Sequence, residues 1–132
     1  MTYLLDTHIF LWSIFNPEKL SSRVNSILND TDNEILVSSI NFWEISIKFA
    51  KGNLNLDGYL PDALIKVTED MGFVLKNLSS EETSSLHNLS GEYHKDPFDR
   101  IIIWQAIHNN YTLISDDKYV NMYKTNGLKV VS

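Results

Sequence analysis

The sequence predicts an α/β fold, a three-layer α/β/α sandwich with a mostly parallel five-stranded sheet. Short apolar runs alternate with stretches of helical spacing along the whole chain, as in parallel sheets covered by helices. Hydrophobic residues make up 43% of the 132 positions, enough to fill a core. We find no repeat, low-complexity tract or linker, so we expect one domain over residues 1–132.

The first strand and the first helix are expected near the start of the chain. Residues 3–5 form a short apolar run that ends in Asp6, which is typical of a buried strand. Asn is a good helix cap and Pro favours the first turn, so a helix should begin at Asn16-Pro17. Its apolar positions keep helical spacing at Leu20, Val24, Ile27 and Leu28.

The next strand covers residues 34–38, and Ser39 can cap a helix that runs to about Lys51 and stops at Gly52. Further along, capping patterns and turn residues set the boundaries. The remaining elements are expected as a loop at 54–59, a helix from Pro61 to about Gly72, a strand at 73–75, a helix capped by Ser79-Ser80-Glu81-Glu82, a loop at 91–95, a helix from Pro97 to about 109–110, a strand at 112–115, a helix at 118–124, a turn at Asn126-Gly127 and a strand at 128–131.

Charge and composition exclude several classes of protein. The net charge of −6 argues against a passive, charge-driven nucleic-acid binder, although carboxylates that hold a cation are compatible with an enzyme acting on nucleic acid. There is no cysteine, which excludes disulfides and thiolate metal sites. We find no signal peptide and no apolar stretch long enough for a bilayer, and therefore expect a cytoplasmic protein without membrane contact.

Acidic residues fall where strands end. Asp6 closes the first strand, Asp116 and Asp117 follow the fourth strand, and Asp99 lies in the first turn of the helix before it. Taken singly, each could be a cap, a favourable charge at a helix start or a turn residue. Because ligands of parallel sheets bind beyond the carboxyl ends of strands, we expect these carboxylates to meet in one site.

Glu44 belongs to the same set for a different reason. It lies in a predicted helix that is apolar on more than one side, and a carboxylate buried there is costly unless it is paired or bound to a metal. A partner on the same helix is available in Lys48, four residues on. The apolar surroundings favour a buried, functional Glu44 over this helical ion pair.

A cluster of these carboxylates needs a cation near neutral pH. At roughly 5 Å and an effective dielectric constant of about 20, each pair repels by about 3 kcal/mol. Oxygen ligands without cysteine indicate Mg²⁺ or Mn²⁺, and such a site suits hydrolysis of phosphodiester bonds. The histidines, which do not form a zinc spacing and are expected on the surface, in loops or in packing, are His8, His87, His94 and His108.

Four segments in order carry a family resemblance: MTYLLDTHIFLW, SSINFWEISIK, HKDPFDRIIIWQA and TLISDDKYV. Together they resemble a PIN domain, and most closely the VapC-type toxins of bacterial toxin–antitoxin pairs whose first motif reads D-T-H. The resemblance spans nearly the whole chain. It implies an endoribonuclease dependent on Mg²⁺ or Mn²⁺, usually dimeric and inhibited by a small antitoxin protein.

The resemblance also implies roles for individual residues. The acidic quartet of the family falls on Asp6, Glu44, Asp99 and Asp117. The family pattern after the fourth strand is Ser/Thr-x-Asp, which points to Asp117, although Asp116 could substitute. Thr7 and Ser115 match polar positions that orient water or metal ligands.

Other residues are candidates for supporting roles. Asp96, just before Pro97, is expected to cap its helix, so that Asp99 faces the metal from a rigid first turn. Arg100 could pair with Asp96 or contact an RNA phosphate. Further candidates for phosphate contacts are Lys48, Lys51 and Lys95. Three tryptophans, which could stack on bases but fit core or dimer packing better, are Trp12, Trp43 and Trp104.

Other functions fit the sequence less well. A haloacid-dehalogenase-type phosphatase would need a second Asp two residues after Asp6, where His8 stands, and a receiver domain would need acidic residues that are absent. The serious alternative is a PIN-like module that binds protein or RNA without cutting it. For a homodimer, the helix with Phe42, Ile45 and Phe49 offers apolar area.

Overall fold

A parallel sheet forms the centre of the computed structural model, which describes residues 1–93 and 95–132. Its strand order is β3-β2-β1-β4-β5, and each neighbouring pair of these strands is parallel. The strands are β1 (Thr2–Leu5), β2 (Glu34–Ser38), β3 (Val74–Lys76), β4 (Thr112–Ile114) and β5 (Lys129–Val131). The predicted fold class is confirmed.

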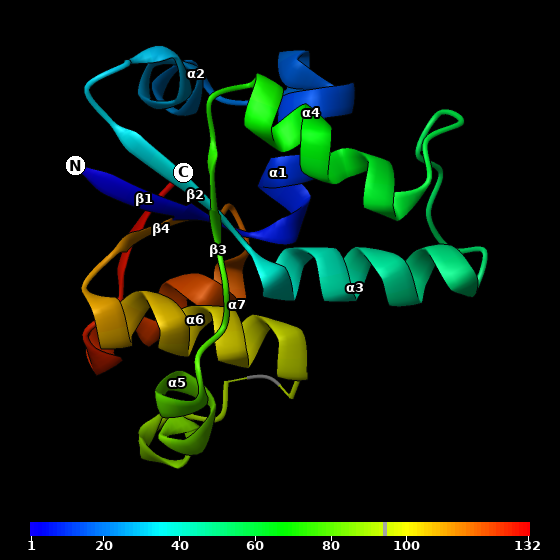
Figure 1. Cartoon of the computed structure of the whole chain (residues 1–132). Coiled ribbons are helices and arrows are strands. Elements are labelled where there is room, and N and C mark those ends of the chain that lie inside the picture. The colour runs from blue at the N-terminus through cyan, green and yellow to red at the C-terminus, as the bar shows by residue number, and fades with distance from the viewer. Residues whose placement is uncertain (94) are drawn as a thin grey trace.

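Helices cover both faces of this sheet, with α1, α2 and α4 on one side and α5, α6 and α7 on the other (Figure 1). The α-helices are α1 (Thr7–Phe15), α2 (Ser22–Asn29), α3 (Ser39–Ala50), α4 (Leu64–Asp70), α5 (Ser80–Ser84), α6 (Pro97–Asn109) and α7 (Lys118–Asn121). Short 3₁₀ turns are η1 (Pro17–Lys19), η2 (Pro61–Ala63), η3 (Leu86–Asn88) and η4 (Met122–Asn126).

The core lies in two layers, one on each face of the sheet. Successive residues of β1 point to opposite faces, so Tyr3 and Leu5 pack with residues of α1, α2 and α4, while Leu4 packs with residues of α6 and η4. Strands buried on both faces read as continuous apolar runs, which explains the sequence pattern. The sheet therefore fixes the ends of β1, β2 and β4 rigidly between two cores.

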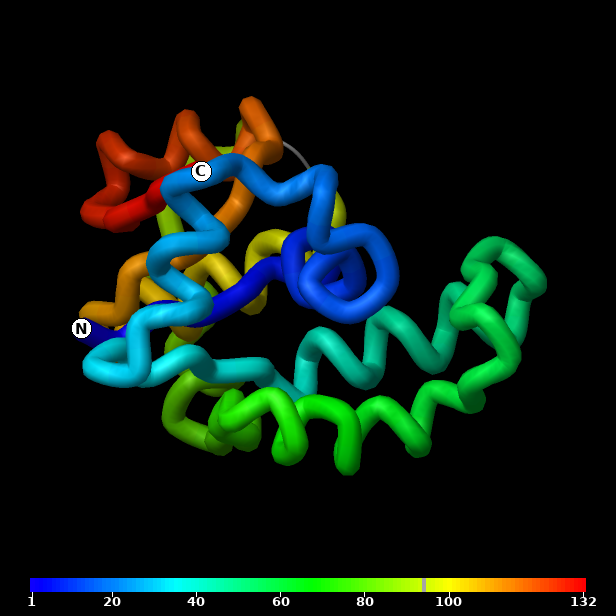
Figure 2. The backbone as a smooth tube through the Cα atoms, turned by 90° about the horizontal axis from the view of Figure 1, so that it is seen from above, coloured from blue at the N-terminus to red at the C-terminus, as the bar shows by residue number. Residues whose placement is uncertain are grey.

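Helices α3 and α4 run side by side and extend away from the sheet, joined by a loop at their far end (Figure 2). Among the described residues, no helix is long and apolar enough to cross a membrane. The side chains of Phe42, Ile45 and Phe49 pack into the core beside α1. Ile45 is buried and Phe42 and Phe49 are partly buried, so much of their apolar area is used inside the molecule, and a dimer contact of this helix stays a prediction.

Most helix boundaries match the capping residues in the sequence. Ser79 and Glu82 form the predicted capping box of α5. Asp96 caps α6, with Pro97 in its first turn, and α6 ends at Asn110 in a left-handed conformation with φ 60°. The Ser that caps α3 is Ser38 rather than Ser39.

The segment between β1 and β2 differs from the prediction. A helix was expected from Asn16, but Pro17–Lys19 form only a 3₁₀ turn, and α2 begins later with Ser21 as its cap. The Ser21 hydroxyl accepts a hydrogen bond from the Val24 N–H. Helix α1, directly after Asp6, was not predicted.

Candidate metal centre

A cavity of about 500 Å³ opens beyond the carboxyl ends of the central strands. Six of its lining residues are acidic, and they include all the carboxylates singled out in the sequence. The residues that line this acidic cavity are Asp6, Thr7, His8, Leu11, Glu44, Lys48, Asn53, Leu54, Asp96, Asp99, Asp116 and Asp117. The prediction that distant acidic residues meet in one cavity is thus confirmed.

Asp6 is one of two buried carboxylates of this cavity, with 8% of its surface exposed. Its backbone N–H donates to the Ile114 carbonyl, so β1 and β4 stay together up to this residue. Its side chain caps α1, because Oδ1 accepts a 2.8 Å hydrogen bond from the Ile9 N–H. One residue therefore ends a strand, begins a helix and faces the acidic cavity.

Burial raises the pKa of the Asp6 carboxyl from the ordinary 3.8 to about 7. The charges of Asp116 and Asp99 raise this pKa further, whereas hydrogen bonds from the Ser115 hydroxyl and the Ile9 N–H oppose the shift. Without a cation, Asp6 thus holds a proton over much of the range below neutral pH.

Glu44 is buried on α3, with 6% of its surface exposed, as its apolar surroundings predicted. Its Oε2 accepts a 2.6 Å hydrogen bond from the Lys48 ammonium group. The sequence argued against this helical ion pair, and that preference was wrong. The long lysine stem lets the ammonium group reach the cavity although the rest of the side chain is half exposed.

Asp96 and Asp99 line the same cavity from the start of α6. Oδ1 of Asp96 accepts hydrogen bonds from the N–H groups of Phe98 and Asp99, at 2.9 and 3.2 Å, so it is the predicted cap. The cap fixes the first turn of the helix and with it the backbone of Asp99. Asp99 is partly buried, and its charge acts on Asp6.

Asp116 and Asp117 both line the cavity after β4. Asp117 caps α7 through a 2.7 Å hydrogen bond from the Tyr119 N–H to its Oδ1, and its own N–H donates to the Ser115 hydroxyl. Asp116 is more exposed, and its charge raises the pKa of Asp6. The two residues therefore remain alternatives for the fourth carboxylate.

Within the described part of the chain, no three acidic or histidine side chains are already arranged to hold a metal ion. Three of the acidic side chains have other partners here: Asp6 and Asp117 cap helices, and Glu44 forms an ion pair with Lys48. The donor set itself, made of carboxylates in one cavity with a raised Asp6 pKa, suits a hard divalent cation. His94 lies outside the described residues.

Asn41 was missed in the sequence, although it is fully buried beside the cavity. Its Oδ1 accepts from the Ser38 N–H at 2.8 Å, and its Nδ2 donates to Thr7 Oγ1 at 2.9 Å and to the Leu5 carbonyl. It thus joins the ends of β1 and β2 to the start of α1. The signal was its place three residues after Ser38, where a capping box has its second polar residue.

Arg100 is held by other partners than Asp96, with which the sequence suggested that it could pair. Its Nη1 donates to the Gly91 carbonyl and to the Tyr123 hydroxyl, at 2.7 and 2.8 Å, and its Nη2 donates to the Leu89 carbonyl. The guanidinium group thus ties a loop to the second core layer. Arg100 is not among the described residues that line the acidic cavity, and the predicted pairing with Asp96 was wrong, whereas its contact with an RNA phosphate stays a prediction.

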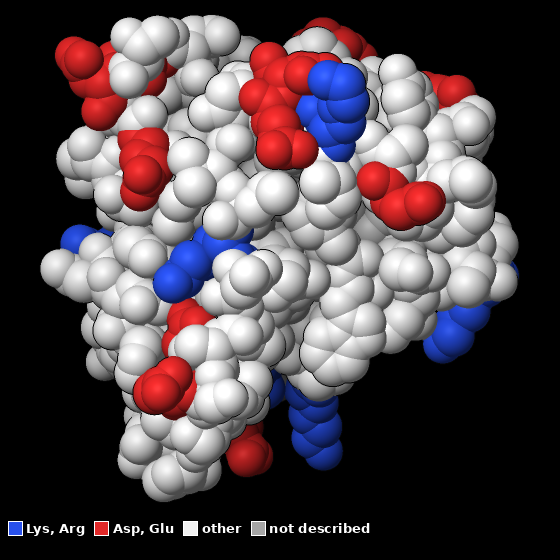
Figure 3. Space-filling model, in the orientation of Figure 1, with Lys and Arg blue, Asp and Glu red and all other residues white. Residues whose placement is uncertain are grey.

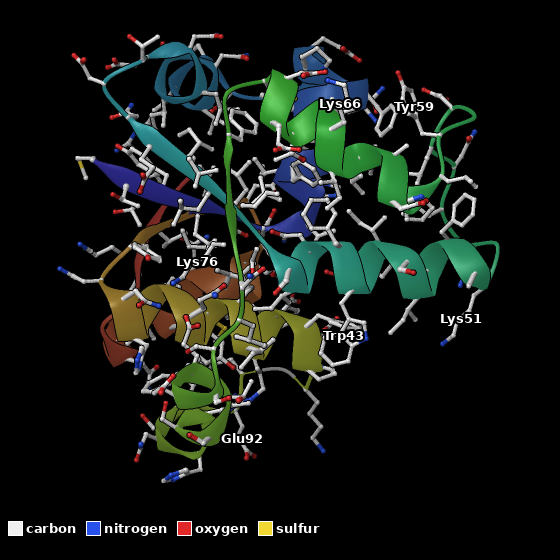
Figure 4. The ribbon with its side chains drawn as sticks, viewed as in Figure 1. Trp43, Lys51, Tyr59, Lys66, Lys76 and Glu92 are labelled. Atoms are coloured by element: carbon white, nitrogen blue, oxygen red, sulfur yellow. The ribbon has the colours of Figure 1, made fainter. Side chains whose placement is uncertain are left out.

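The tryptophans differ in exposure. Trp12, which belongs to α1, packs against the core. The Nε1 of Trp104 donates a hydrogen bond to the Ser85 hydroxyl. Both residues agree with the packing expected for them. Trp43 is 56% exposed and meets Phe98 edge to face, with ring centroids 5.1 Å apart. It projects from α3 into solvent (Figure 4).

Basic side chains form no continuous patch on the face shown in Figure 3, where blue groups are separated by uncharged surface. This agrees with the net charge of −6. Of the described residues that line the acidic cavity, Lys48 is the one Lys or Arg. Any phosphate that entered would meet this single ammonium group and the ends of helices.

Comparison with known proteins gives a consistent result. The family model described as "PIN domain" matches residues 3–126. A curated relative, "Ribonuclease VapC22" of Mycobacterium tuberculosis, is 23% identical over 123 residues, covering 93% of this chain and 92% of its own.

Two solved structures share the fold. The structure of VapBC2 from Rickettsia felis bound to a DNA fragment from their promoter has a TM-score of 0.73 at 22% identity, with 99% of this chain and 98% of that chain covered. VapBC-1 from nontypeable Haemophilus influenzae gives 0.70 at 19% identity, with 100% and 98% covered.

We predict that Asp6→Asn stabilises the metal-free protein at pH 8. Asn can keep the cap on α1 but carries no charge to bury. Because the folded-state pKa of Asp6 is raised, the wild-type free energy of unfolding falls as the pH rises from about 4 to about 7. We expect the variant to gain roughly 1–3 kcal/mol at pH 8 and almost nothing near pH 4.

Urea unfolding in EDTA at both pH values measures this gain. Asp32→Asn, at an exposed acid, is the matched control and should change little. Equal stability of Asp6→Asn and wild type at pH 8 would contradict the burial argument.

We also predict that Arg100→Met lowers the free energy of unfolding by roughly 1–3 kcal/mol, because two carbonyls and the Tyr123 hydroxyl lose their donor. Arg100→Lys should not restore it, since one ammonium group does not match the guanidinium fork. Chemical denaturation compares these variants with Arg23→Met at an exposed site. A fully stable Arg100→Met protein would contradict this structural role of Arg100.

Proposed function

Because the chain belongs to the PIN domain family, we propose that it is a VapC-type toxin, an endoribonuclease that depends on Mg²⁺ or Mn²⁺. The observation that carries the proposal is the acidic cavity, where six carboxylates from four separate parts of the chain line one space. The relative named a ribonuclease, matched over almost its whole length, supports the choice of RNA as substrate.

Asp6, Glu44, Asp99 and either Asp117 or Asp116 would hold the divalent ion. When bound, the ion supplies a lower pKa for coordinated water and stabilises negative charge on phosphate oxygens. The repulsion among these carboxylates and the raised Asp6 pKa both favour a cation in this place. An amide at Asp6 would remove one ligand and keep the fold.

The residues around the quartet have positioning roles in this proposal. Ser115 donates to Asp6, and Asn41 holds Thr7, so both sides of the β1 end are fixed before substrate arrives. Asp96 holds the first turn of α6. Lys48 is the cation of the cavity lining that can approach a phosphate oxygen of the substrate.

We further propose an antitoxin protein and a second copy of the chain as partners, in the cytoplasm. The fold is shared with proteins solved as VapBC assemblies, which supports a protein partner. The exposed Trp43 and Leu60 side chains are apolar surface of the kind that partners cover. Light scattering of the purified chain, alone and with the product of an adjacent short gene, tests both partners.

We predict cleavage of structured RNA in Mg²⁺ or Mn²⁺ and its loss in EDTA. Asp6→Asn and Asp99→Asn should each lower the cleavage rate by more than about a hundredfold, because each removes a proposed metal ligand. Asp32→Asn should keep wild-type activity. A labelled-RNA gel assay with freshly added metal measures these rates.

Two results would argue against the proposal. Full activity of Asp6→Asn would exclude this cavity as the active site. Absence of cleavage for all RNAs tested, together with tight binding to a protein or RNA partner, would favour a PIN-like binding module without catalysis.

A further inference from the structure

Lys48 lies in an unusual place for a lysine of a metal-binding cavity. It stands one helical turn after Glu44 on α3, and its Nζ is 2.6 Å from Glu44 Oε2. Half of the Lys48 side chain is exposed, whereas only 7% of the Glu44 side chain is. The ammonium group therefore bridges solvent and the interior of the acidic cavity.

The ammonium group of Lys48 lies near carboxylates from more than one part of the chain. Lys48 lines the acidic cavity together with Glu44, Asp96 and Asp99 and forms an ion pair with Glu44. These carboxylates come from both α3 and the start of α6. In the absence of another cation, Lys48 thus offsets part of the negative charge of the site.

The ion pair also engages Glu44 Oε2, an oxygen that a divalent ion bound by Glu44 could use. A buried carboxylate without a cation is strongly disfavoured, so Glu44 needs either Lys48 or a metal ion beside it. The lysine ammonium is a compact charge on a flexible stem, and its half-exposed position lets it move into water at little cost.

We propose that Lys48 is a tethered counter-ion of the candidate metal centre in its metal-free state, and that it holds Glu44 until a divalent ion displaces it. This inference rests on the proposed function, because it assumes that Glu44 is a metal ligand. Lys48 then lowers the affinity for the metal and keeps the metal-free fold stable. A purely positioning lysine would have the opposite effect on affinity, because its loss would disorder Glu44.

The test compares Mn²⁺ binding by calorimetry in wild type, Lys48→Met and Lys51→Met. Methionine keeps most of the stem and removes the charge. Lys51 is an exposed lysine at the C-cap of the same helix and controls for general charge effects (Figure 4). We expect Lys48→Met to bind Mn²⁺ roughly fivefold more tightly or better, and Lys51→Met to differ by less than about twofold.

Thermal unfolding gives a second readout that does not depend on activity. Without metal, Lys48→Met should melt a few degrees, about 2–6 °C, below wild type, because Glu44 is left buried without a cation. With saturating Mn²⁺ this difference should shrink, because the metal replaces the lysine. If Lys48→Met folds poorly, Lys48→Gln, which can still donate a hydrogen bond to Glu44, gives the same comparison.

The outcomes separate this inference from the proposed function. Equal or weaker Mn²⁺ binding by Lys48→Met, with normal binding by wild type, would overturn the counter-ion role and leave the metal centre intact. Binding by Lys48→Met but not by wild type would support it strongly. Absence of Mn²⁺ binding in all variants would overturn both.

Discussion

The repulsion among carboxylates in one cavity is the constraint on which the rest of the structure depends. Six acidic side chains line a space of about 500 Å³, and burial raises the pKa of one of them, Asp6, to about 7. Three features of the molecule lower the cost of this repulsion. Asp6 can hold a proton, and the Lys48 ammonium group forms an ion pair with Glu44. Backbone N–H groups donate hydrogen bonds to Asp6, Asp96 and Asp117. A site that needs such compensation is well suited to a divalent cation.

The parallel sheet is what allows that charge to be concentrated. Two core layers hold the central strands, so the residues that follow β1 and β4 emerge side by side at the same edge. The starts of α1, α6 and α7 also lie there, and their free N–H groups are donors for carboxylates. Asn41 completes the arrangement by linking the ends of β1 and β2 without adding charge.

Much of this could be predicted from the sequence because it depends on local patterns. The run EILVS, the Asp96-Pro97 cap and the carboxylates at strand ends each have a local physical reason, and the structure confirms them. Helix α1 was missed because THIFLWSIF is apolar on nearly every side and shows no helical periodicity. The partners of Arg100 were also missed, because they are carbonyls of a loop that folds back onto α6, which spacing along the chain does not reveal. The Lys48–Glu44 pair was weighed wrongly, since burial of Glu44 was taken to exclude a partner that reaches in from solvent.

Several acidic residues here serve the backbone and the cavity at once, and this has a practical consequence. Asp6, Asp96 and Asp117 each accept a hydrogen bond through an oxygen that an amide side chain also possesses. Exchange of one carboxylate oxygen for an amide nitrogen can therefore remove a negative charge from the cavity and keep the hydrogen bond to the backbone. A folded variant of this kind could be used as bait to capture the molecules that normally bind the protein.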